Sequence, residues 1–216
     1  MITRSRFVVV PDWAGKPVDF LIDGWPVIER FEPVEKDYEV GLTDLTHRPK
    51  AIVHGSGSKE LDRLEPGQSI WTGQGFLSLV KPGEAVLFDV AGPMELSLTD
   101  RYTDMTEAWV LFCLWGKKSI PVLQRLFSVD VDRPRVVQPF YLVTRWHALV
   151  VQVLNLKVKE QGYLLATDRS HGQNLFDGLL HAGQHLGLKP VGLRSWEQWF
   201  ARSGFSSGSV ESPSWR

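Results

Sequence analysis

Apolar residues occur along the chain in short runs separated by glycine, proline and charged residues, a pattern typical of strands joined by tight turns. It predicts strands at residues 18–22, 25–28, 50–54, 76–80, 85–90, 109–115, 146–156 and 162–166. Helical spacing of apolar residues predicts helices at residues 59–64, 119–127, 170–185 and 195–202. Asp23–Gly24 is a strong hairpin-turn signal, Ser58 is a plausible N-cap for the first helix, and Asp168 or Ser170 could cap the third. Antiparallel hairpins alternating with helices indicate an α+β fold with helices packed on sheets.

One part of the sequence recurs. The element Thr-Asp-x-Thr around Asp44 returns around Asp104, and each copy is followed by a strand, a glycine turn and a helix. Two copies are too few for a solenoid. We therefore expect one domain built from two pseudo-symmetric strand–helix–strand–strand halves, in which residues 41–90 superpose on residues 102–166.

Composition narrows the classes of protein that the chain can belong to. Hydrophobic residues make up 43% of it and the formal net charge is −1, so it has the material for one core and no charge suited to general nucleic-acid binding. No apolar stretch is long enough to span a bilayer. The apolar run 7–10 is too short for the core of a signal peptide, and we expect a cytoplasmic protein.

Nine tryptophans are many for 216 residues and suggest a surface that contacts another protein. Four of them lie near the ends of the chain, where the demand for core packing is less clear. We predict an interface at Trp13, Trp25, Trp196 and Trp199.

Several residues could carry chemistry, and for each the structural interpretation is favoured. Asp44 or Asp104 could act as a base, but their symmetric recurrence favours a turn-forming role for both. His181 and His185 have a spacing that can bind metal, although a polar helix face is the commoner cause. Cys113 lies in an apolar strand and is expected to behave as a small hydrophobe. We predict no catalytic residue and no metal site.

Several short motifs resemble, in the same order, motifs of the glycine-cleavage T-protein (aminomethyltransferase) family. They are Val18-Asp19-Phe20, Gly24-Trp25-Pro26, Thr43-Asp44-Leu45-Thr46-His47, Glu160-Gln161-Gly162-Tyr163, His181-Ala182-Gly183 and Lys189-Pro190-Val191-Gly192-Leu193-Arg194. A full T-protein carries a further C-terminal barrel domain. In length the chain is closer to the gamma subunit of heterotetrameric sarcosine oxidase, a small member of the same superfamily. Asp168-Arg169-Ser170 resembles a stretch of that subunit.

The repeat and the resemblance together suggest a division of the chain. We expect an N-terminal arm or hairpin over residues 1–40, packed on a T-protein-like domain over residues 41–202. The repeats of that domain would cover about residues 41–100 and 101–200. Residues 203–216, rich in serine and glycine, would form a flexible tail.

The resemblance also implies a tetrahydrofolate site between the halves. Glu160 would accept hydrogen bonds from the pterin, with Tyr163 and Arg194 at the pterin and the tail of the ligand. A solvated turn carboxylate is the alternative interpretation of Glu160. The second acidic residue of the family falls near residues 75–78, where this chain has no carboxylate. We therefore expect a pocket that is narrowed or closed, and weak folate binding at most.

The first functional hypothesis is an accessory, non-catalytic subunit of a larger redox or one-carbon enzyme, with a degenerate folate pocket. One alternative is a tetrahydrofolate-binding aminomethyl- or methyltransferase. Another is a partner of a lipoyl carrier protein in a disulfide-reductase-like, sulfur-oxidising assembly. None of the three involves nucleic acid or a membrane.

Overall fold

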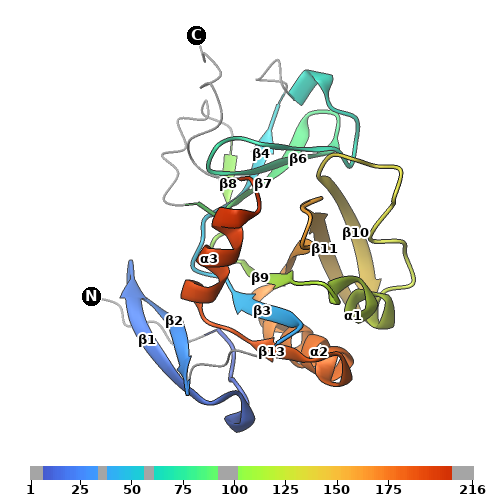
Figure 1. Ribbon diagram of the computed structural model, residues 1–216. Coiled ribbons are helices and arrows are strands. Elements are labelled where there is room, and N and C mark those ends of the chain that lie inside the picture. Colours follow the sequence, from blue (N-terminus) through green and yellow to red (C-terminus); the bar gives the residue numbers. More distant parts are fainter. Residues whose placement is uncertain (1–6, 34–37, 56–60, 92–101, 206–216) are drawn as a thin grey trace.

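The computed structural model describes residues 7–33, 38–55, 61–91 and 102–205 (Figure 1). Within these ranges the strands form a two-stranded sheet β1-β2, a six-stranded sheet of order β10-β11-β12-β9-β3-β13 and a five-stranded sheet of order β5-β6-β7-β4-β8. The strands are β1 (Lys16–Ile22), β2 (Trp25–Glu32), β3 (Val40–Asp44), β4 (Lys50–His54), β5 (Ser69–Trp71), β6 (Gly75–Lys81), β7 (Glu84–Asp89), β8 (Tyr102–Asp104), β9 (Trp109–Trp115), β10 (Phe140–Trp146), β11 (Leu149–Asn155), β12 (Gly162–Asp168) and β13 (Leu188–Pro190). The α-helices are α1 (Ser119–Leu126), α2 (Gly172–Gly183) and α3 (Leu193–Arg202), and the 3₁₀ turns are η1 (Asp12–Ala14), η2 (Leu61–Arg63), η3 (Arg169–His171) and η4 (Gln184–Leu186).

The two larger sheets have the same strand order. Strands β5-β6-β7-β4 of the first half correspond to β10-β11-β12-β9 of the second. Each half gives its first strand to the other sheet, because β3 pairs with β9 while β8 pairs with β4. This arrangement confirms the predicted α+β fold of two similar halves, and it adds a strand exchange that ties the halves together.

Matching turns follow the two exchanged strands. The carboxylate of Asp44 accepts a hydrogen bond from the N–H of Thr46 at 2.9 Å, and that of Asp104 accepts one from the N–H of Thr106 at 2.8 Å. A side-chain oxygen that accepts a bond two residues onward replaces a backbone turn bond. Both aspartates therefore have the structural role that the repeat predicts.

The threonine of each turn then bonds to a strand of the other half. The Thr46 hydroxyl accepts a hydrogen bond from the N–H of Leu111 in β9 at 3.0 Å. Its counterpart, the Thr106 hydroxyl, accepts one from the N–H of Lys50 in β4 at 3.1 Å. The junction between the halves is thus built from reciprocal contacts of the repeated element.

Other elements of the fold pack against both faces of the six-stranded sheet. Helices α1 and α2 cover one face, where Leu114, Val122 and Leu179 are fully buried. The opposite face meets the five-stranded sheet and α3, and a second apolar cluster joins side chains of all three. The hairpin β1-β2 lies beside α3 (Figure 1) and contributes Trp25 and Val27 to this second cluster.

Some of the sequence-predicted elements differ from the structure. The strand predicted at 146–156 corresponds to β11, which begins only at Leu149. The sequence did not predict its partner β10 or the turn between them at His147, whose φ of 51° is positive although no glycine marks the turn. Of the helix predicted at 59–64, residues 61–63 form only the single turn η2, and the predicted N-cap at residue 58 lies outside the described residues.

The C-terminal elements differ in smaller ways. Helix α2 is shorter than predicted at both ends, and its N-cap is His171. Asp168 is the N-cap residue of the preceding turn η3, although its side chain forms no capping hydrogen bond, and Ser170 lies inside that turn. The tail predicted from residue 203 begins with ordered contacts, because the ring of Phe205 packs on Trp71 and Phe76. Residues 206–216 lie outside the described part. No helix of that part is long and apolar enough to cross a bilayer.

Candidate functional site

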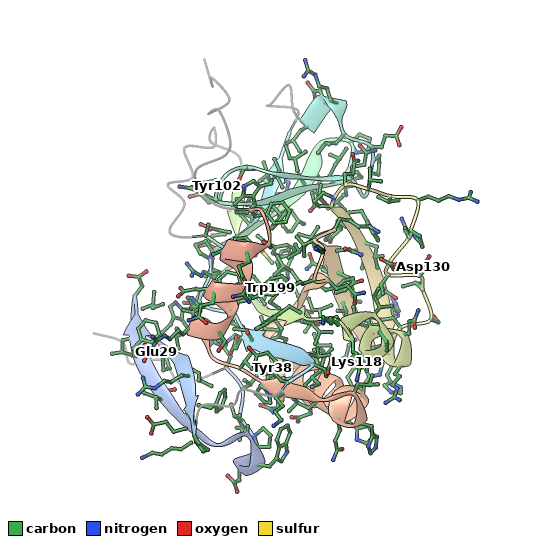
Figure 2. The ribbon with its side chains drawn as sticks, viewed as in Figure 1. Glu29, Tyr38, Tyr102, Lys118, Asp130 and Trp199 are labelled. Carbon is green, nitrogen blue, oxygen red and sulfur yellow. The ribbon has the colours of Figure 1, made fainter. Side chains whose placement is uncertain are left out.

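Aromatic rings fill the space between the two larger sheets. We name as the central aromatic cluster Trp71, Phe76, Trp115, Trp196, Trp199, Phe200 and Phe205. Ring centroids are 5.3 Å apart for Trp115 and Trp199 and 4.9 Å apart for Phe76 and Phe205. These separations are typical of packed aromatic pairs. Strands of both sheets and α3 contribute to the cluster, and Trp199 lies in the interior (Figure 2).

Two glycines make room for the indole rings. A Cβ atom added at Gly162 would lie 2.4 Å from the ring of Trp199, and one added at Gly41 would lie 2.6 Å from the ring of Trp115. Such distances are far below van der Waals contact, so the rings rest directly on the backbone. Gly162 is the first residue of β12 and follows the turn that contains Glu160.

The three residues predicted for folate do not meet at one site. Glu160 is exposed in the turn before β12, and its backbone oxygen accepts a hydrogen bond from the N–H of Gly116 at 3.2 Å. Tyr163 is only 1% exposed and belongs to the cluster under α1 and α2. Burial raises the pKa of its hydroxyl, so the ring stays neutral. Arg194 is exposed on α3, which covers the opposite face of the sheet. The structure therefore does not bring these three side chains together.

Three of the four tryptophans predicted at an interface are core residues. Trp25, Trp196 and Trp199 are 4%, 2% and 1% exposed, because α3 and β2 turn these rings inward against the sheets. The spacing Trp196, Trp199, Phe200 is the i, i+3, i+4 pattern of a buried helix face and could have indicated this. Trp13, at 55% exposure, is the member of the set that lies on the surface.

A buried lysine occupies the junction between the halves. Lys50 is only 1% exposed. Its ammonium donates hydrogen bonds to the backbone oxygens of Thr46 and Arg48, both at 2.7 Å. Burial lowers the pKa of Lys50 to about 7, while the carboxylates of Asp44 and Asp104 oppose the shift. Sequence reasoning missed this residue, because a lysine at the start of a strand gives no sign of burial.

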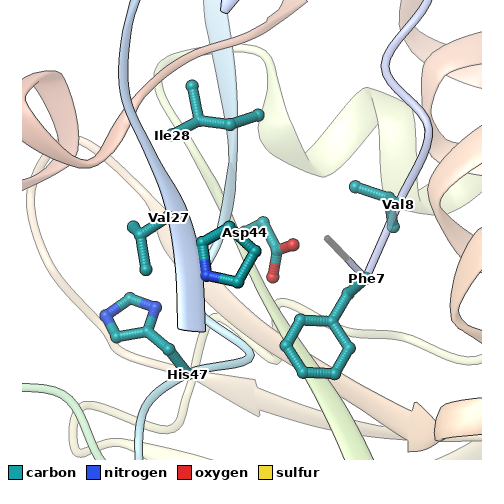
Figure 3. Close-up of a pocket in the computed structure, with 7 residues that line it drawn as sticks. Phe7, Val8, Val27, Ile28, Asp44 and His47 are labelled. Atoms are coloured by element: carbon teal, nitrogen blue, oxygen red, sulfur yellow. The ribbon is translucent and has the colours of Figure 1, made fainter. Parts of the chain in front are cut away.

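A small cavity lies next to this junction, under the N-terminal segment. Figure 3 shows the Asp44 carboxylate between Phe7 and Val8 on one side and β2 on the other, with His47 nearby. The cavity measures about 10 Å³, room for one water at most. Burial lowers the pKa of His47 to about 3 and raises that of the Asp44 carboxyl. The cavity itself is too small to hold a substrate.

A larger open cleft of about 570 Å³ lies on the outer face of α2. It is lined by Trp146, His147, Ala148, Leu149, Asn174, Asp177, Gly178 and His181. The cleft also borders a hollow of about 220 Å³ that includes Trp13. Among the described residues, no group of three histidine, cysteine or acidic side chains could hold a metal ion.

The lone cysteine is also removed from solvent. Cys113 is fully buried, and burial raises the pKa of its thiol to about 12, although the indole of Trp196 lowers it in part. A thiolate is the nucleophilic form of cysteine. The thiol therefore stays protonated, as expected of a small hydrophobe.

Comparisons with known proteins point to one family. The model of the GCVT N-terminal domain matches residues 92–207, more than half of the chain. Among solved structures, heterotetrameric sarcosine oxidase from Corynebacterium sp. U-96, in complex with pyrrole 2-carboxylate, is similar with a TM-score of 0.56 and 14% sequence identity. That match covers 70% of this chain and 88% of the other. No curated protein matches the chain.

Proposed function

Because the chain belongs to the GCVT N-terminal domain family, we propose that it is an accessory subunit of a larger redox or one-carbon enzyme, with a closed folate pocket. The resemblance to T-proteins places the ligand of the family between the two halves. In this chain that space holds the central aromatic cluster, and this observation carries the proposal. The domain would provide a binding surface for its partner subunits and would not itself catalyse a reaction.

The residues around that space do not fit a pterin. A pterin needs acceptors for its amino and ring N–H groups, and each donor left unpaired in a buried site costs about 1–3 kcal/mol. Strand β6, where the family places an acidic residue, presents the buried neutral residues 75–78. Phe76 of that stretch packs on Trp71 at a centroid distance of 4.9 Å. Glu160 faces solvent.

The similarity in fold to a subunit of a heterotetramer supports the proposal of partner subunits. Of the four tryptophans predicted at an interface, Trp13 is the one that is exposed, next to the hollow on α2, and we propose that it contacts such a partner. We also propose that residues 1–40, which include the hairpin β1-β2, are an arm on a domain of residues 41–202.

Purification at native expression level tests the proposal. A tagged chain should elute with larger subunits, at a mass well above the 24.5 kDa of the chain alone. Trp13→Ala should weaken this association if Trp13 lies in the interface, whereas Phe20→Ala on the exposed hairpin strand β1 is a matched aromatic control. A chain that elutes without larger partners would contradict the proposal.

The same purification separates the alternatives. Capture of a carrier protein that bears lipoyl-lysine, without a larger redox subunit, would favour the lipoyl-partner hypothesis. A chain that transfers a one-carbon group from tetrahydrofolate without partners would favour the transferase.

A further inference from the structure

The six-stranded sheet ends in two unlike edges. At one edge, β13 has three residues, among them Lys189 and Pro190, and such short strands with lysine and proline discourage further pairing. At the other edge, β10 has seven residues and pairs with β11 along its whole length without a bulge. Figure 1 shows β10 at the outer side of the sheet. A long regular edge of this kind is a template for another strand.

The hydrogen bonds at the start of β10 identify which of its backbone groups point outward. The N–H of Tyr141 and the C=O of Pro139 bond to the segment 67–69 at 2.6 and 3.1 Å. The backbone N–H and C=O groups of odd-numbered residues in β10 therefore point away from β11. Val143 and Arg145 are the next two, and within the described part of the chain their backbone groups form no bond on that side. The open part of the edge is residues 142–146, which ends where the chain turns at His147.

We propose that this edge pairs with the same edge of a second copy of the chain, antiparallel and about a two-fold axis at Thr144. In this register Val143 lies opposite the partner's Arg145 and Arg145 lies opposite the partner's Val143. Each of these pairs exchanges two backbone hydrogen bonds, so all outward groups of the open segment are satisfied. The two six-stranded sheets then continue as one.

The segment is complementary to itself in this register. Thr144 meets the partner's Thr144, and Leu142 meets the partner's Trp146, both favourable cross-strand pairs. Neither Arg145 faces another arginine, which a register centred on that residue would force. The two-fold axis at Thr144 lies at the centre of the open segment. In this register the partner's turn at His147 lies opposite Tyr141, the residue at which the hydrogen bonds to segment 67–69 end, so the two sets of bonds do not compete. These features favour a second copy over an unrelated strand.

Sedimentation of the full chain over a range of concentrations tests the pairing. We expect a reversible dimer. Val143→Pro removes an outward N–H that the fold does not use and should weaken dimerisation by about tenfold or more, since two symmetric bonds are lost. Val143→Thr keeps the N–H and the branched shape and should dimerise like the original chain. Circular dichroism melts check that both variants fold.

Cross-linking provides a readout that does not depend on proline. Thr144→Cys should form a disulfide between copies, because facing residues of a non-hydrogen-bonded pair lie about 4.5 Å apart at Cα. Val143→Cys should not, since its counterpart is a diagonal neighbour about 7–8 Å away. A chain that stays monomeric at high concentration, a dimer that Val143→Pro does not weaken, or failure of Thr144→Cys to cross-link would each overturn the proposal. Binding of a foreign strand to β10 in a monomeric chain would overturn it as well.

Discussion

Replacing Lys50 with methionine tests the energetics of the junction between the two halves. In the folded chain burial lowers the pKa of Lys50 to about 7, from an ordinary value of 10.5. Between these pH values the unfolded chain carries the proton and the folded chain does not. Unfolding therefore takes up a proton, and the free energy of unfolding rises with pH by about 1.4 kcal/mol per unit. Over the whole window this amounts to about 5 kcal/mol, a large part of the stability of a typical domain.

The assay is chemical denaturation of the original chain and of Lys50→Met, followed by tryptophan fluorescence at several pH values. Methionine does not titrate, so contributions of other groups cancel in the difference between the two proteins. That difference should grow in favour of the original chain by about 2–3 kcal/mol between about pH 7.5 and about pH 9.5. Lys81→Met, at a side chain that is 65% exposed, is the control and should leave the pH dependence unchanged. Parallel pH profiles for the original chain and Lys50→Met would refute the reasoning.

Three further substitutions and one labelling reaction probe the core. Thr46→Val should lower the free energy of unfolding by about 1–3 kcal/mol, because the buried N–H of Leu111 loses its acceptor. The equivalent Thr106→Val should lower that free energy by less, because its turn is half-buried. Equal losses for the two variants in chemical denaturation would contradict this. Gly162→Ala should cost about 1–3 kcal/mol in the same assay, since its Cβ would lie 2.4 Å from the Trp199 ring, and an unchanged melting temperature would show that the ring can move. Cys113 should react with iodoacetamide only after unfolding, because burial raises the pKa of its thiol to about 12; rapid labelling of the folded chain would count against that burial.

Local patterns predicted the elements whose turns carry chemical signals. The hairpins at Asp23–Gly24 and residues 81–84 have turn residues that tolerate the required backbone angles, and both form. The turn at His147 has no such residue and was missed. The Thr-Asp-x-Thr element disclosed the repeat. The strand exchange could not be predicted, because which strands pair depends on contacts far apart in the sequence.

The candidate site was harder to predict than the fold. Glu160 and Tyr163 lie three residues apart in a motif that the family uses for folate, but their roles here depend on what fills the space between the sheets. Trp199 and Phe205 fill it, from the far end of the sequence. The sequence showed that an acidic residue was missing near Phe76, which led to the expectation of a narrowed pocket. It did not show that the tryptophans near the C-terminus would occupy that space.

Titration of the purified chain with tetrahydrofolate, followed by calorimetry and tryptophan fluorescence, tests the central claim most directly. If the central aromatic cluster closes the folate pocket, as proposed, a pterin finds no room there, and Trp115, Trp196 and Trp199 would report any ligand that entered. We predict no saturable heat and no fluorescence change up to about millimolar ligand, a concentration that would reveal even weak binding. Saturable binding that Glu160→Ala abolishes, with the fold of the variant intact, would contradict the account and restore the folate-dependent enzyme.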